Sequence, residues 1–271
     1  MKEAVIVSAV RTPLGNFNGS LSSVGATDLG ALVIEEAIKR AGISKESVNE
    51  AIMGQVLPCG YGQNPAKQAA VKAGLPWETE CITVNKVCGS SLKAVMLAAQ
   101  AVQLGDAEIV VAGGMENMTM APYILPKARG GYRMGHGQVL DHMFFDGLQN
   151  PDDGLMMGVF GVRCAEKFNF TRDQQDAFSI ASIERALAAM EGQFAAEISP
   201  VTVKSRRGES VITEDQEPPS CNIGKIPSLR AAFKKDGTVT AASSSKISDG
   251  AAATVLMSAE KAAEMGLTPL A

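Results

Sequence analysis

Short apolar runs alternate with amphipathic stretches through the first 117 residues of the chain. The apolar runs have the length and composition of buried strands, and they cover residues 3–9, 51–57, 81–85 and 108–112. The stretches between them repeat with helical periodicity, and they cover residues 27–41, 66–73 and 90–104. This alternation predicts an α/β layered domain with largely parallel strands. Thr27 is the expected cap of the first helix, and Gly42 and Gly105 are expected to end the first and third helices.

The pattern changes after residue 117. Residues 118–160 are rich in Gly, Met and Pro with weak periodicity, and long irregular stretches of this kind usually carry function. Thr171 is followed three residues later by Gln174, the form of a capping box, which predicts a helix to about residue 191. Strands are expected near residues 199–205, 210–213 and 250–258, and a short helix at 260–265. We therefore expect an α/β core, residues 1–117 and 248–271, with one insertion, residues 118–247.

Composition narrows the function classes. Of the 271 residues 46% are hydrophobic and 20% are charged, so a sizeable core can form. The net charge is −4 and no basic run is interleaved with aromatic residues, which argues against a nucleic-acid partner. The most apolar stretches, such as residues 4–10 and 109–114, are too short to span a bilayer, and the N-terminus lacks the regions of a signal peptide. We expect a soluble cytoplasmic protein without a membrane partner.

Cysteine and histidine spacing does not favour a metal site or a disulfide framework. The five cysteines are odd in number, widely spaced and without a Cys-x-x-Cys pair, and they are Cys59, Cys81, Cys88, Cys164 and Cys221. His136 and His142 are six residues apart, which does not put both on one helix face. For any one of these cysteines, the ordinary interpretation is a small buried hydrophobe.

Cys88 is the exception, because it lies between the strand at 81–85 and the helix at 90–104. A thiol at that point faces the positive end of the helix dipole and its unpaired N–H groups, which favour a thiolate. Gly89 keeps the backbone uncrowded, and the N–H of Cys88 could donate to an acyl oxygen. The same arrangement carries the nucleophile of acyl-transfer enzymes on other folds. Cys88 is therefore the candidate catalytic residue.

Several short motifs occur in order along the chain. They are Val-Ser-Ala-Val-Arg-Thr-Pro at 7–13 with Gly15, Asn-Lys-Val-Cys-Gly-Ser at 85–90, Gly-Gly-Met-Glu-Asn-Met at 113–118, Arg-Gly-Gly-Tyr-Arg-Met-Gly at 129–135, Thr-Arg-Asp-Gln-Gln-Asp at 171–176, Asp-Gly-Thr-Val-Thr-Ala at 236–241 and Ser-Asp-Gly-Ala-Ala at 248–252. In this order and spacing, the chain resembles the thiolases over its whole length. The resemblance implies the N-terminal half of an α-β-α layered sandwich. The insertion would be the loop domain, which binds CoA and takes part in oligomerisation.

The resemblance also implies an activity. Thiolases transfer an acyl group through the cysteine that matches Cys88, and they need no metal or organic redox cofactor. The expected reaction is acetyl-CoA C-acetyltransfer, in which two acetyl-CoA give acetoacetyl-CoA and CoA, by a homodimer or homotetramer. The positions that match the CoA contacts of the family are Leu148, Met157, Lys225, Phe233, Ala241 and Ser245. Phe233 could pack on the adenine, Ser245 could bond the pantetheine and Lys225 could meet a phosphate. Phe233 and Leu148 could equally be core residues, and Lys225 a solvated surface charge.

The family's second half carries a Gly-His-Pro histidine, an Asn-Glu-Ala loop and a basic cysteine in a Cys-x-Gly loop, and none of them is present in these 271 residues. We expect the chain alone to lack thiolase activity, with the C-terminal half missing or on another chain. Met156 stands where many short-chain thiolases have histidine, which weakens the preference for acetoacetyl-CoA.

Three other functions stay open from the sequence. They are a 3-ketoacyl-CoA thiolase of fatty-acid degradation, a non-catalytic acyl- or lipid-binding module, and a decarboxylating ketosynthase-like condensing enzyme. Ketosynthase-like condensing enzymes share the layered fold and a cysteine at a helix start with this chain. They lack the Asn-Lys-Val-Cys-Gly-Ser and Gly-Gly-Met-Glu motifs and an insertion of this length.

Overall fold

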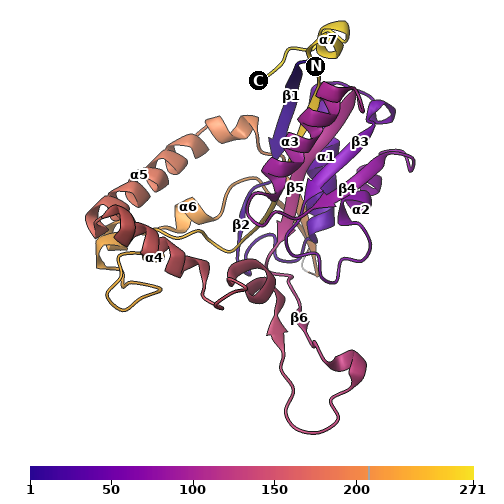
Figure 1. Ribbon diagram of the computed structural model, residues 1–271. Coiled ribbons are helices and arrows are strands. Elements are labelled where there is room, and N and C mark those ends of the chain that lie inside the picture. Colours follow the sequence, from indigo (N-terminus) through magenta and orange to yellow (C-terminus); the bar gives the residue numbers. More distant parts are fainter. Residues whose placement is uncertain (207) are drawn as a thin grey trace. The chain divides into compact units, whose positions relative to one another are not determined.

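The computed structural model describes residues 1–206 and 208–271 and divides into two compact units. The first unit comprises Met1–Ala121, Glu197–Glu214 and Ser248–Ala271, and the second comprises Pro122–Ala196 and Asp215–Ile247 (Figure 1). The predicted boundaries at 117 and 248 lie close to these divisions. The first unit holds Cys88, and the second holds all six residues expected to contact CoA.

A mixed sheet forms the centre of the first unit (Figure 1). Its strands are β1 (Ala4–Arg11), β2 (Gly15–Asn16), β3 (Glu50–Gly54), β4 (Glu80–Val84), β5 (Ile109–Asn117) and β10 (Ser248–Ser258). The order is β1-β10-β5-β3-β4, with β2 paired to β10. β3 is parallel to β4 and β5, whereas β10 is antiparallel to β1 and β5. Of the five strands in this order, β10 alone runs antiparallel to the others and departs from the expectation of largely parallel strands. It follows the insertion and returns between two neighbours that run in the opposite direction.

Helices cover both faces of this sheet. The helices of the first unit are α1 (Ala26–Ala41), α2 (Pro65–Lys72), α3 (Ser90–Leu104) and α7 (Ala259–Glu264), with a 3₁₀ helix at Lys45–Ser47. Val111 of β5 belongs to the core under α1 and α2, whereas its neighbours Val110 and Ala112 belong to the core under α3. Successive residues of a strand face opposite sides of the sheet. The result is the expected α-β-α sandwich, with α3 on one face and α1 and α2 on the other.

Helix ends follow the sequence signals with one exception. Gly42 and Gly105 end α1 and α3 in the left-handed conformation, at φ 68° and 83°. Gly25, without a side-chain bond, is the residue before α1, so the expectation that Thr27 caps this helix is wrong. Thr27 lies within the first turn and is buried, and its hydroxyl accepts from Lys72 Nζ at 2.9 Å. A threonine held by another helix is not available as a cap.

The hairpin of β8 (Val201–Ser205) and β9 (Gly208–Ile212) belongs to the first unit, although it falls within the expected insertion at 118–247. The Nε of Arg11 donates to Glu197 Oε1 at 2.7 Å. Val201 and Val203 join the larger hydrophobic core. The insertion is therefore two segments, separated by a hairpin that packs with the α/β core.

The second unit is mainly helical. Its elements are β6 (Tyr123–Ile124), β7 (Leu140–Asp141), α4 (Met157–Phe168), α5 (Arg172–Met190), α6 (Glu217–Ser220), a π-helix at Met143–Leu148, and 3₁₀ helices at Ala128–Gly130, Gln193–Ala196 and Ile223–Ser228. The predicted capping box at the start of α5 is confirmed: Thr171 Oγ1 accepts from the N–H of Gln174 at 3.2 Å, and Gln174 Oε1 accepts from the N–H of Thr171 at 2.9 Å. The sequence did not predict α4, which contains Gly158 and Gly161, residues that weaken helical propensity.

Among the residues that the structure describes, one segment is long and apolar enough to cross a membrane by length and composition alone. It is Val87–Leu104, with a mean hydropathy of 1.3. Within it, α3 has 15 residues and spans about 22 Å, less than the ~30 Å of a hydrocarbon core. Ala94, Ala98 and Val102 pack against the sheet, whereas Leu92 and Met96 are exposed. The sheet contact makes α3 a layer of the first unit, with an apolar outer face.

Candidate active site

Cys88 lies in a tight turn that leads from β4 into α3. The N–H of Gly89 donates to the carbonyl of Lys86 at 3.1 Å, and the N–H of Ser90 donates to the carbonyl of Val87 at 3.1 Å. The thiol is exposed. Gly89 provides no side-chain cap for α3, so the first N–H groups of the helix can meet a negative charge. The expected position of Cys88 at a helix start is confirmed, and it suits a nucleophile or an acyl carrier.

Two side chains hold this turn in an unusual conformation. Val87 has φ 48°, in the left-handed region that β-branched residues rarely adopt. Asn85 Oδ1 accepts from the N–H of Val87 at 3.0 Å. Ser90 Oγ accepts from the N–H of Lys86 at 2.8 Å and donates to the carbonyl of Val87 at 2.6 Å. Both backbone polar groups of the strained Val87, its N–H and its carbonyl, are therefore hydrogen-bonded to side chains directly before Cys88.

Two glycines allow the start of α3 to approach the sheet. A Cβ at Gly54, the last residue of β3, would lie 2.6 Å from the backbone nitrogen of Ser91. A Cβ at Gly114 of β5 would lie 2.0 Å from Ser91 Oγ. No real Cβ approaches other atoms so closely, so only glycine fits at either position without a shift. The small residues of these strands thus set the position of the helix that follows Cys88.

Cys88 opens on a hollow of about 310 Å³ within the first unit, which Gln55, Val56, Val87 and Glu116 also line. Gln55 is only 1% exposed, and its Nε2 donates to the carbonyl of Leu57 at 3.5 Å. Its Oε1 has no hydrogen-bond partner among the residues that the structure describes. A buried acceptor of this kind normally receives a donor, and this one belongs to a side chain that lines the hollow.

Sequence reasoning did not identify Glu116 as a site residue, although it lies in the Gly-Gly-Met-Glu motif. Its Oε2 accepts from the N–H of Val56 at 2.7 Å, and its Oε1 accepts from the N–H of Leu57 at 3.3 Å. Burial raises the pKa of this carboxyl group to about 7, although the two N–H donors act in the opposite direction. An acidic residue near the end of the buried strand β5 was the signal available in the sequence.

The raised pKa of Glu116 predicts a pH-dependent stability. Between its ordinary pKa of 4.5 and about 7, the folded chain keeps a proton that the unfolded chain releases, so the free energy of unfolding falls as pH rises. The free energy of unfolding of wild type minus that of Glu116→Gln should fall by about 3 kcal/mol across this range and stay constant above it. Urea unfolding at a series of pH values measures the difference. Glu78→Gln, at an exposed position, is the control for loss of one charge. Parallel pH profiles of wild type and Glu116→Gln would contradict the prediction.

The two histidines differ in their surroundings. His142 is buried, and its Nδ1 lies 2.5 Å from Asp146 Oδ2, whereas His136 is exposed. Among the residues that the structure describes, no three or more His, Cys, Asp or Glu side chains are grouped to hold a metal ion.

Three of the expected CoA contacts lie around the start of α4. A bridge between Gln149 and Met156 brings Leu148, the last residue of the π-helix, and Met157, the first residue of α4, to neighbouring positions. Phe233 is half-buried, and its ring lies so close to Gly158 that a Cβ there would be 2.3 Å from it. The ring therefore rests against the backbone of α4.

The other three expected contacts line two further hollows of the second unit. Lys225 and Ala241 line one of about 550 Å³, and Ser245 lines one of about 830 Å³. Ala242 and Ser244 line both, so the turn at 241–245 separates them. A bridge between residues 231 and 240 closes the loop that carries Phe233. The structure thus brings the six residues together as two groups of three within one unit.

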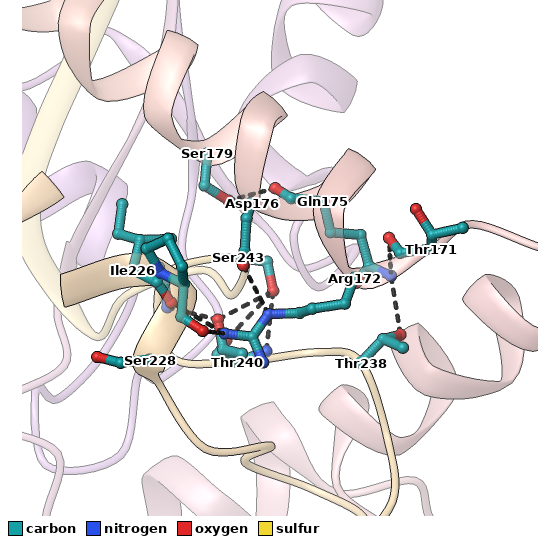
Figure 2. Close-up of polar contacts among 12 residues, drawn as sticks. Thr171, Arg172, Gln175, Asp176, Ser179, Ile226, Ser228, Thr238, Thr240 and Ser243 are labelled. Carbon is teal, nitrogen blue, oxygen red and sulfur yellow. Dashed lines mark hydrogen bonds and ion pairs between the residues drawn. The ribbon is translucent and has the colours of Figure 1, made fainter. Parts of the chain in front are cut away.

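The first turn of α5 holds the segments that carry Lys225 and Ala241 (Figure 2). Arg172 Nε donates to Asp176 Oδ2 at 2.8 Å, and its Nη2 donates to the carbonyls of Ile226 and Pro227 at 2.9 and 3.3 Å. Gln175 Nε2 donates to Thr238 Oγ1 at 2.8 Å. One helix end therefore fixes both the 3₁₀ helix that contains Lys225 and the loop that precedes Ala241.

Comparison with known proteins decides the family. Residues 4–260 match the family model described as the N-terminal domain of thiolase. The acetyl-CoA acetyltransferases of Cupriavidus necator and Escherichia coli are 51% and 53% identical to the chain, each over 100% of this chain and 70% of the relative. The chain belongs to the thiolase family.

A solved structure confirms the thiolase fold expected from the motifs. The crystal structure of the Bacillus anthracis acetyl-CoA acetyltransferase has a TM-score of 0.96 and 40% identity to this thiolase-family chain. The match covers 100% of this chain and 69% of that one. The relatives are thus longer than this chain, which agrees with the expected correspondence to the N-terminal part of a thiolase.

Proposed function

We propose that this thiolase-family chain supplies the acyl-carrying half of an acetyl-CoA C-acetyltransferase, which forms acetoacetyl-CoA and CoA from two acetyl-CoA. The observation that carries the proposal is Cys88, an exposed thiol at the uncapped start of α3 and beside a hollow of about 310 Å³. Relatives about 50% identical over the whole chain bear the name acetyl-CoA acetyltransferase. The proposal includes a cytoplasmic homo-oligomer with no metal or redox cofactor.

Cys88 would act first as nucleophile and then as leaving group. Its thiolate attacks the thioester carbonyl of acetyl-CoA, the bond to the CoA sulfur breaks, and the CoA thiolate takes up a proton. A second acetyl-CoA loses a proton from its α-carbon to a base, and its enolate attacks the acyl carbonyl. A carbon–carbon bond forms and the Cys88 thiolate is released. By the resemblance, the base belongs to the C-terminal half, which the longer relatives contain.

The reactivity of Cys88 tests this role. Substoichiometric iodoacetamide near neutral pH should label Cys88 ahead of the other four cysteines, and acetyl-CoA should leave an acetyl group on the same peptide. Peptide mapping by mass spectrometry reads both reactions. Cys164, which is also exposed, is the internal reference, and Cys88→Ser is the control for acetylation. Preferential labelling of Cys164 or a half-buried cysteine would refute the assignment and favour a non-catalytic acyl-binding module.

We also propose that the second unit binds CoA through the six residues expected from the resemblance. Three of the six, Lys225, Ala241 and Ser245, line two adjoining hollows, and this placement supports the proposal. The chain should bind CoA with a Kd between about micromolar and millimolar, because a site with half of its walls cannot bury the ligand fully.

A charge reversal at the site tests CoA binding. Ser245→Asp should abolish the heat of CoA binding in calorimetry, because its carboxylate repels the anionic ligand. Ser210→Asp, on the exposed hairpin of the first unit, should bind like wild type. Equal heats from wild type and Ser245→Asp would remove Ser245 from the site.

A further inference from the structure

Glu116 is joined to the turn that carries Cys88 by a continuous set of hydrogen bonds. The carboxylate accepts from two consecutive backbone N–H groups, those of Val56 and Leu57, at 2.7 and 3.3 Å. Above the raised pKa of about 7 the group is a carboxylate, and its two charge-assisted hydrogen bonds fix the orientation of this backbone segment. Both oxygens of Glu116 are therefore engaged by the segment that forms one wall of the hollow.

Asn85 connects that segment to the nucleophile turn. Its Nδ2 donates to the carbonyl of Val56 at 3.4 Å, and its Oδ1 accepts from the N–H of Val87 at 3.0 Å. The amide group of Asn85 thus bridges two backbone segments, and the Val56 residue that it contacts is the one that Glu116 also holds. The three contacts form one path from Glu116 through residue 56 and Asn85 to Val87.

The end of this path is the strained residue of the site. Val87 has φ 48°, and its relaxation toward negative φ would rotate the peptide unit that leads to Cys88. Strained backbone persists only where surrounding bonds over-determine it. Ser90 supplies bonds on the α3 side, to the backbone of Lys86 and Val87, and Asn85 supplies the bond to the N–H of Val87. The conformation of the backbone directly before Cys88 therefore depends on where Asn85 is held.

We propose that Glu116 is a positioning residue for Cys88, which acts through the Val56 backbone and the Asn85 side chain to hold Val87 in its left-handed conformation. The proposal rests on the proposed function, in which Cys88 is the nucleophile. It assigns Glu116 an orienting role, because its bonds run to the backbone N–H groups of Val56 and Leu57.

The alkylation rate of Cys88 tests the path in the 271-residue chain. We expect Glu116→Ala and Asn85→Ala each to lower the iodoacetamide rate at Cys88 by about three- to tenfold, since each change removes hydrogen bonds that hold the turn before the thiol. Glu116→Gln should fall between wild type and Glu116→Ala, because it keeps one acceptor for the N–H of Val56. The double variant should be no slower than the slower single variant, because both changes interrupt one path.

Internal controls separate loss of the path from loss of the fold. Labelling of Cys164 in the second unit and of half-buried Cys59 and Cys81 should stay at wild-type rates. Glu50→Gln, at the opposite end of β3 from Gly54, should label like wild type at Cys88. If Cys59 and Cys81 label faster in Glu116→Ala, that variant has lost part of its fold. The labelling rates of Cys88 in Glu116→Gln and Asn85→Ala then test the path.

Two results would overturn the proposal. One is a Cys88 rate that stays unchanged or rises in Asn85→Ala, and the other is a double variant in which the two effects multiply. Loss of labelling in Glu116→Gln as complete as in Glu116→Ala, with Asn85→Ala unaffected, would instead identify a general base at Glu116. If Cys88 is not the fastest thiol of the wild type, the proposed function itself fails. If it is the fastest and the variants match wild type, the positioning role alone fails.

Discussion

The 271-residue chain by itself should cleave acetoacetyl-CoA several orders of magnitude more slowly than a complete thiolase, although it carries Cys88. Acyl transfer needs a thiolate and donors for the oxyanion, and the chain offers the start of α3 and backbone N–H groups. Condensation also needs a base for the α-proton and donors for the enolate, which the resemblance assigns to motifs missing from these residues. A general acid or base contributes roughly 10²–10⁴-fold and an oxyanion donor roughly 10²–10³-fold, so the loss of several removes measurable turnover.

Complementation checks the prediction. Thiolysis of acetoacetyl-CoA is measured with the chain alone and after addition of the segment of the Cupriavidus necator relative that lies outside the match, since this chain covers 70% of that relative. Activity should appear only in the mixture and vanish with Cys88→Ala. Robust turnover by the chain alone, abolished by Cys88→Ala, would show that a base lies within these residues. Glu116, which lines the same hollow, would be the first residue to test.

Local signals in the sequence defined the core elements well. α3 was predicted with its observed bounds because Gly105 ends it and the Cys88 turn begins it. α5 was found from the capping box at Thr171. Thr27 failed as a cap because its hydroxyl accepts from Lys72, 45 residues away in sequence, and no local pattern contains that contact. Elements whose ends depend on neighbouring residues could be predicted, and those that depend on tertiary partners could not.

The site residues could likewise be predicted where neighbouring residues place them, and not where distant residues do. Cys88 was found because a strand, a turn and a helix are consecutive in sequence. Glu116 was missed because its partners Val56 and Leu57 lie 60 and 59 residues away and offer only backbone N–H groups. The expected CoA contacts came from the resemblance alone, since no periodicity connects Leu148 with Ser245. Side-chain bonds to distant backbone cannot be read from residue type.

Arg172→Ala should loosen the segments of the second unit that carry Lys225 and the loop before Ala241. Asp176 is nearly buried, at 8% side-chain exposure against 26% for Arg172, and its Oδ1 has no partner among the described residues. Loss of the guanidinium leaves that carboxylate unpaired and frees two backbone carbonyls. Breaking a fully buried pair costs 3–5 kcal/mol, so this partly exposed one should lose about 2–3 kcal/mol, and amide exchange in α5 and Ile223–Ser228 should accelerate roughly 30- to 150-fold.

Hydrogen exchange read by mass spectrometry measures this effect locally, within the unit that contains the ion pair. Arg163→Ala is the matched control: its side chain is 54% exposed and lies 3.9 Å from Asp153, so exchange should stay near wild type. In a background of Asp176→Asn, Arg172→Ala should accelerate exchange less, because no buried charge is left unpaired. Unchanged exchange in Arg172→Ala, or an equal acceleration in both backgrounds, would show that the ion pair does not hold these segments.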